Sequence, residues 1–167
     1  MPADTAAGPE GDPSPPTIVV DGNNVMGAAA DGWWRDRQGA VLRLAGRLEC
    51  YRARTGDGVL LVLDVPHPQL PEGGDGGPGE GRIGIRYPAR RGRDAADDRI
   101  VTLLDEWAAG TTGTTGGIGA AGGIGVAGDG EVVVVTSDRA LAGRVAGRGA
   151  RVVGAGAFLG RLRDLGC

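Results

Sequence analysis

Apolar residues along this chain form short continuous runs, separated by stretches in which they recur every three or four positions. The continuous and alternating runs predict strands at 17–21, 58–64, 82–87, 131–138 and 150–154. Helical spacing predicts helices at 39–54, 97–109, about 139–147 and about 157–164. Buried strands that alternate with helices predict an α/β fold, in which a mostly parallel central sheet is covered by helices on both faces.

An aspartate follows each of the three most apolar strand patterns. These residues are Asp21, Asp64 and Asp138. In a parallel sheet the carboxyl ends of the strands meet at one edge, and ligands bind outside that edge. We therefore expect the three acids to lie at the same edge of the sheet.

A second acidic group, Asp94, Asp97 and Asp98, stands where the helix at 97–109 begins. Any one acid in such a place could simply cap a helix or complement its dipole. Several carboxylates converging on one edge, however, raise each other's pKa values unless a cation lies among them. A ligand set made only of oxygen suits Mg²⁺ or Mn²⁺, which can activate water and neutralise a phosphodiester. The acids thus predict metal-dependent phosphodiester hydrolysis.

Composition excludes several other chemistries. The 167 residues suit one domain, the formal net charge is −3, and all 18 basic residues are arginine. Without lysine the chain can form neither a Schiff base nor a Walker phosphate site. The single histidine, His67, is interpreted as a loop residue, and two distant cysteines cannot complete a standard zinc site with it.

The two ends of the chain and its cysteines carry expectations about location. Residues 1–16 are rich in proline, glycine and acids, and are expected to form a disordered tail before a single domain at 17–167. The sequence pattern leads us to expect neither a leader nor a membrane-spanning segment. Cys50 and Cys167 are expected to be reduced, in a soluble cytoplasmic protein.

A glycine-rich segment at about 110–130 matches the dinucleotide pattern G-x-G-x-x-G twice. That pattern must follow a strand and open a helix, whereas this segment follows a helix and leads into a strand. The segment is therefore predicted to be a flexible insertion, and no nucleotide cofactor is expected.

Three short motifs, in this order, resemble those of a known family. They are D-G-x-N at 21–24, A-D-D-x-I at 96–100 and T-S-D at 136–138, with Phe158-Leu159 downstream. Together they resemble the NYN domain, the YacP-like branch of the PIN-like nuclease superfamily. The stretch DGWWRDR at 31–37 is similar to small actinobacterial members of that group.

The resemblance spans roughly 17–165, and it implies a three-layer, Rossmann-like PIN fold and a metal-dependent ribonuclease. By position, Asp21, Asp97 and Asp138 match the family's metal-binding acids, and Asp98 matches the adjacent catalytic acid. Asp64 is a further candidate metal ligand, ranked after these three acids. The resemblance also implies roles that organise the site, with Asn24 arranging it and a hydroxyl of Thr136 or Ser137 orienting Asp138.

Arginines crowd the approach to the acidic helix, and Arg90, Arg91 and Arg93 are the candidate RNA contacts. Guanidinium groups match phosphate oxygens, although a solvated charged face would have the same pattern. RNA is the expected partner, with a non-catalytic PIN-like module that binds RNA or protein as the alternative function. The sequence leaves open one metal or two, association with the ribosome, and self-association.

Overall fold

The computed structural model describes residues 14–79, 81–111 and 130–167, and its centre is a five-stranded sheet. Every pairing between these strands is parallel, in the order β3-β2-β1-β4-β5. The strands are β1 (Thr17–Asp21), β2 (Gly58–Val62), β3 (Gly84–Arg86), β4 (Val132–Val135) and β5 (Arg151–Val153). The predicted α/β fold with a parallel sheet is confirmed.

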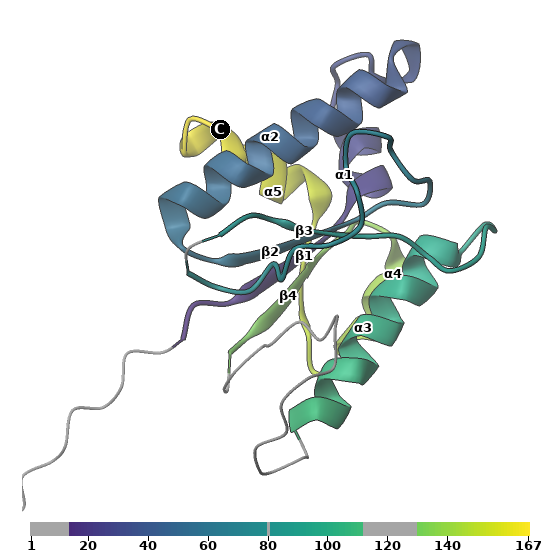
Figure 1. The fold of residues 1–167 in the computed structure, drawn as a ribbon, viewed down its shortest axis with the longest axis vertical. Helices are drawn as coiled ribbons and strands as arrows, with labels where there is room; N and C mark the ends of the chain where they lie inside the picture. Colours follow the sequence, from purple (N-terminus) through teal and green to yellow (C-terminus); the bar gives the residue numbers. More distant parts are fainter. Residues whose placement is uncertain (1–13, 80, 112–129) are drawn as a thin grey trace, which may run out of the picture.

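Helices cover both faces of the sheet, which gives three layers (Figure 1). One face carries α1 (Gly22–Ala28), α2 (Arg37–Thr55) and α5 (Ala155–Asp164), and the other carries α3 (Ala95–Thr111) and α4 (Arg139–Ala146). A short 3-10 helix, η1 (Trp33–Arg35), leads into α2.

The central strand β1 shows why the layers form. Its side chains alternate between the two faces, so that Ile18 and Val20 pack into the core beneath α1, α2 and α5, while Val19 packs beneath α3 and α4. All three residues are buried. A strand that is apolar on both faces is typical of a parallel sheet enclosed by helices.

Helix α1 was not among the predicted elements. Its sequence GNNVMGA contains two glycines and two asparagines, which are poor helix formers. The helix is nevertheless capped by Asp21 and buries Val25 and Met26 in the core. Tertiary packing therefore outweighs the weak local propensity.

The cysteines differ from the expectation. Cys50 and Cys167 form a disulfide, with their Cα atoms 5.7 Å apart, so the prediction of two reduced thiols is wrong for this structure. Helix α2 brings Cys50 beside the end of the chain, where the Arg47 guanidinium also donates to the Cys167 carbonyl oxygen at 2.9 Å. This proximity depends on how α2 and α5 pack, which the sequence spacing did not reveal.

Two further predictions concern segments that the structure covers only in part. Residues 1–13 of the predicted tail and 112–129 of the predicted glycine-rich insertion lie outside the described residues. Within the parts of the chain that are described, no helix has the length and apolar character needed to cross a membrane.

Candidate functional site

Asp21 is the central acid of the site, at the carboxyl end of the middle strand. Only 5% of the residue is exposed. Its Oδ1 accepts a hydrogen bond from the backbone N–H of Asn24 at 3.3 Å, and its Oδ2 accepts one from the Thr136 hydroxyl at 3.0 Å. The carboxylate therefore caps α1 and is fixed in orientation from the neighbouring strand β4.

The loop after β4 is joined to α1 by a second set of hydrogen bonds. Asn24 Oδ1 accepts from the backbone N–H of Ser137 at 2.7 Å, which holds this loop against α1. The Thr136 oxygen accepts from the backbone N–H of Asp138 at 3.1 Å while its hydroxyl donates to Asp21. Asn24 and Thr136 thus fix the relative positions of the acids at the ends of β1 and β4.

The hydroxyl groups act differently from the prediction that one of them orients the Asp138 carboxylate. Thr136 donates to Asp21, and Ser137 Oγ accepts from the backbone N–H of Ala155 at 2.9 Å, which satisfies the first turn of α5. The Asp138 carboxylate instead accepts from the backbone N–H of Leu141 at 3.0 Å and caps α4. The backbone turn at 136–138 decides these directions, and sequence spacing alone does not.

Asp97 lies in the first turn of α3, on the other side of the same edge. The pKa of Asp97 is raised to about 6. Burial is the largest cause, and the negative charges of Asp21, Asp138 and Asp94 add to it. The pKa of Asp21 is also raised, first by burial and then by the charges of Asp138 and Asp64, against the lowering effect of its two hydrogen bonds. The acids on β1, α3 and the loop after β4 therefore interact electrostatically.

Asp98 and Asp64 are held by arginines. Asp98 bonds the Arg144 guanidinium at 2.7 Å and that of Arg90 at 3.2 Å, and these bonds lower the pKa of the Asp98 carboxyl below its usual value. Asp64 pairs with Arg37 at 3.2 Å. Both carboxylates thus have arginine partners. No ion pair of Asp21 or Asp97 is found within the described residues, although the charge of Arg144 acts to lower the pKa of Asp97.

The predicted RNA contacts lie in the exposed segment just before α3. Arg90, Arg91 and Arg93 are all exposed, and the Arg90 guanidinium reaches Asp98. Arg144, which sequence reasoning missed, comes from α4 to the same acid. The only signal for Arg144 is its place on the face of α4 that meets α3, which requires the fold to be known.

The fit of a divalent cation to these residues depends on the kind of site. Among the described residues, no group of three or more His, Cys, Asp or Glu side chains is placed to hold a metal ion. The available donors are carboxylate oxygens, and Mg²⁺ commonly binds through one or two carboxylates, with waters and substrate phosphate as the other ligands. Burial, and then neighbouring carboxylates, raise the pKa of both Asp21 and Asp97, so a cation at their oxygens would be favoured. With fewer than three protein ligands, the residues fit only an open, partly hydrated cation site.

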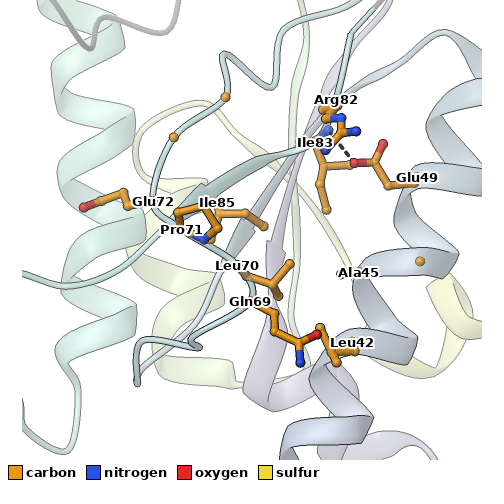
Figure 2. A pocket seen from close by; sticks show the side chains of 13 residues that line it. Leu42, Ala45, Glu49, Gln69, Leu70, Pro71, Glu72, Arg82, Ile83 and Ile85 are labelled. Atoms are coloured by element: carbon orange, nitrogen blue, oxygen red, sulfur yellow. Dashed lines mark hydrogen bonds between the residues drawn. The ribbon is translucent and has the colours of Figure 1, made fainter.

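A cavity of about 520 Å³ lies away from these acids, between α2 and the edge strand β3 (Figure 2). Leu42, Leu70 and Ile83 form part of its apolar lining. Glu49 on its wall is already used, because its carboxylate accepts from the backbone N–H of Ile83 at 3.3 Å. None of the predicted acids lines this cavity, so its size alone does not make it the functional site.

Comparisons with known proteins bear on the fold. No protein-family model matches the chain, and no curated protein matches it. The solved structures that match include two of Rae1 (YacP) from Bacillus subtilis. The fold is similar to that of YacP.

The two YacP structures match to similar extents. A tryptophan-to-leucine mutant aligns with a TM-score of 0.59 and 20% sequence identity, over 89% of this chain and 75% of that one. The other structure gives a TM-score of 0.57 and 22% identity, over 89% and 74%. The Rossmann-like α/β arrangement is thereby supported, while this level of identity assigns no residue role.

Proposed function

We propose that this chain is a metal-dependent ribonuclease, an endonuclease that hydrolyses RNA phosphodiester bonds. The observation that carries the proposal is the placement of three acids from separate elements: Asp21 at the end of β1, Asp138 joined to it through Thr136, and Asp97 in the first turn of α3. The charges of Asp21 and Asp138 both act to raise the pKa of Asp97. A partly buried group of carboxylates destabilises the fold unless a cation or a proton is shared among them. Such a cost is typical of functional sites rather than of structural ones.

In this proposal Asp21 and Asp97 hold Mg²⁺ or Mn²⁺, with Asp138 beside them and Asp64 as a further acid at the edge. The cation supplies an activated water and neutralises charge on the phosphate. Thr136 keeps the Asp21 carboxylate in one orientation by donating to Oδ2. Asn24 holds the loop that carries Asp138, through its bond to the Ser137 N–H.

The arginines would bring the RNA to these acids. Asp98, matched by position to a catalytic acid, holds Arg90 and Arg144 close to Asp97. Guanidinium groups pair with phosphate oxygens through two parallel hydrogen bonds, so this segment, with Arg91 and Arg93, suits a nucleic-acid backbone. The proposal includes a relationship to the small actinobacterial NYN type. It also includes a cytoplasmic location, although the Cys50–Cys167 disulfide removes the support that reduced thiols would have given.

A non-catalytic RNA-binding or protein-interaction module is the second candidate. It is favoured because, within the described residues, no group of three or more His, Cys, Asp or Glu side chains is placed to hold a metal ion. The retention of acids on β1, α3 and the loop after β4 favours the enzyme, since a module without catalysis gains nothing from their mutual repulsion.

Cleavage of a fluorescently labelled single-stranded RNA separates the two candidates. We expect cleavage in Mn²⁺ or Mg²⁺, none with excess chelator, and none by Asp21→Asn, whose amide oxygen can still cap α1. Asp105→Asn is the matched control, because Asp105 is an exposed acid on α3 that pairs with Arg148 away from the site. RNA binding without cation-dependent cleavage by the wild-type chain would instead establish the non-catalytic module.

A further inference from the structure

A second pocket, of about 330 Å³, opens directly beside the acids. It lies between the start of α2 and the segment that follows β2, and Asn23 and Asp64 belong to its lining. Asn23 is two residues from Asp21, and the charge of Asp64 acts on Asp21. A molecule bound in this pocket would therefore adjoin whatever binds at Asp21.

His67 gives this pocket an unused hydrogen-bond donor. The residue lines the pocket, is only 7% exposed, and accepts from the backbone N–H of Gln69 through Nδ1 at 3.1 Å. The neutral ring then carries its proton on Nε2. Nε2 is buried and has no hydrogen-bond partner among the described residues. A buried donor left without a partner costs about 1–3 kcal/mol, which a bound acceptor would recover.

The rest of the lining suits a flat ring rather than a phosphate. Val41, Leu63 and Pro66 contribute apolar surface. The one guanidinium in the lining, from Arg37, is already paired with Asp64 at 3.2 Å, and it also donates to Asn23 Oδ1 at 3.5 Å. The guanidinium in this lining is therefore already paired, whereas His67 Nε2 has no hydrogen-bond partner among the described residues.

The size and position of the pocket limit which molecules it could bind. Small-molecule pockets have volumes of roughly 300–1,000 Å³, so this one is at the lower end and suits a single small ring system. Proteins that recognise single-stranded RNA take unstacked bases into pockets and bond to their edges. The backbone of such a strand would continue past Asp64 to the acids.

We propose that this pocket, with His67 Nε2 as a donor, binds one nucleobase of the RNA strand next to the bond that is cut. The inference rests on the proposed function for its substrate class. It adds a site for base recognition, and hence a preference for the position of cleavage.

Binding can be tested without any cleavage. The ¹⁵N-labelled full chain, free of metal, is titrated with AMP, CMP, GMP and UMP in the millimolar range, and with ribose 5-phosphate as the control without a base. We expect saturable NMR shifts at Gln38, Val65 and His67 with at least one nucleotide and none with ribose 5-phosphate. No shift with any nucleotide, or equal shifts with ribose 5-phosphate, would overturn the proposal.

Variants tie the binding to the pocket. His67→Phe keeps a ring but lacks the donor, and Gln38→Ala changes an exposed residue of the lining that does not support the core. Both should weaken nucleotide binding several-fold, whereas Gln69→Ala, which retains the backbone bond to His67, should not. If a thermal melt shows that His67→Phe does not fold, the test rests on Gln38→Ala. Unchanged nucleotide binding by Gln38→Ala would then refute the proposal that this pocket binds a nucleobase.

Cleavage of RNAs with a single abasic position separates this inference from the proposed function. We expect one abasic position beside the cleaved bond to lower kcat/KM by about tenfold for the wild-type chain, and to add little to the defect of His67→Phe. Cleavage that is insensitive to every abasic position refutes the pocket and leaves the ribonuclease intact. Nucleotide binding in a chain that never cleaves refutes the ribonuclease and leaves the pocket intact.

Discussion

At the residue scale, Asp97 links the stability of the protein to its proposed function. Its pKa of about 6 lies above the ordinary aspartate value of 3.8, so the fold favours the protonated form. The stability that this gives is fully present below about pH 3.8 and is lost as the pH rises through 6. At neutral pH the metal-free protein therefore carries an unfavourable charge at Asp97.

Asp97→Asn should raise the melting temperature at pH 7.5 in chelator by a few degrees, because it removes that charge. Mn²⁺ should stabilise the wild-type chain and have a smaller effect on Asp97→Asn. Thermal unfolding followed by circular dichroism between pH 5 and 8 measures both effects. Asp105→Asn is the control, since the Arg148 bond lowers the pKa of Asp105 and its loss should give no gain in stability. A destabilised Asp97→Asn at pH 7.5 would contradict the account.

The sequence located the acids better than it located their partners. Asp21 and Asp138 follow apolar strands, and parallel pairing alone places them at one edge. The bonds from Thr136 to Asp21 and from Ser137 to α5 depend on backbone angles within one short loop. Arg144 meets Asp98 across 46 positions of the chain, a contact that only the packing of α3 on α4 creates.

At the scale of elements, α1 shows what periodicity fails to detect. The helix spans only seven residues and lacks a full apolar stripe, so the apolar pattern does not predict it. Gly22, its first residue, is needed for packing. A Cβ atom at Gly22 would lie 2.6 Å from Leu63 Cδ2 and 2.9 Å from Leu61 Cδ1, so glycine is needed for close packing of α1 on β2.

Gly22→Ala should therefore destabilise the protein by about 1–3 kcal/mol, the usual cost of overpacking a core. Gly27→Ala, in the same helix, is the matched control, because a Cβ there meets nothing within 4 Å. It should be neutral or slightly stabilising, since alanine favours a helix over glycine. Urea denaturation measures both, and equal effects of the two substitutions would refute the packing of α1 described here.

At the scale of the whole molecule, basic residues lie at both ends of the sheet, and only one end should bind RNA. Replacing Arg90, Arg91 and Arg93 by alanine should weaken RNA binding and flatten its dependence on salt, by up to about two units of slope. Arg54, Arg151 and Arg163 form the matched triple, at the carboxyl ends of α2 and α5 and the start of β5. Fluorescence anisotropy at several salt concentrations compares them, and equal losses from both triples would show only nonspecific attraction.

The disulfide joins parts of the molecule that are 117 positions apart. A bridge of that span restricts the unfolded chain, so Cys167→Ser should lower the free energy of unfolding by about 2–4 kcal/mol under oxidising conditions. Urea denaturation with and without reductant measures the effect. Reductant should bring the wild-type chain to the level of Cys167→Ser and leave that variant unchanged, and a wild-type chain indifferent to reductant would rule out the bridge.

The central claim is that the acids at the carboxyl edge of the sheet form a site that cuts RNA with a divalent cation. The most direct measurement is the single-turnover cleavage rate of a labelled single-stranded RNA in saturating Mn²⁺, for the wild-type chain, Asp97→Asn and Asp105→Asn. We predict that Asp105→Asn cleaves at the wild-type rate, and that Asp97→Asn loses at least about a hundredfold while remaining folded. Cleavage by Asp97→Asn at the wild-type rate would contradict the account.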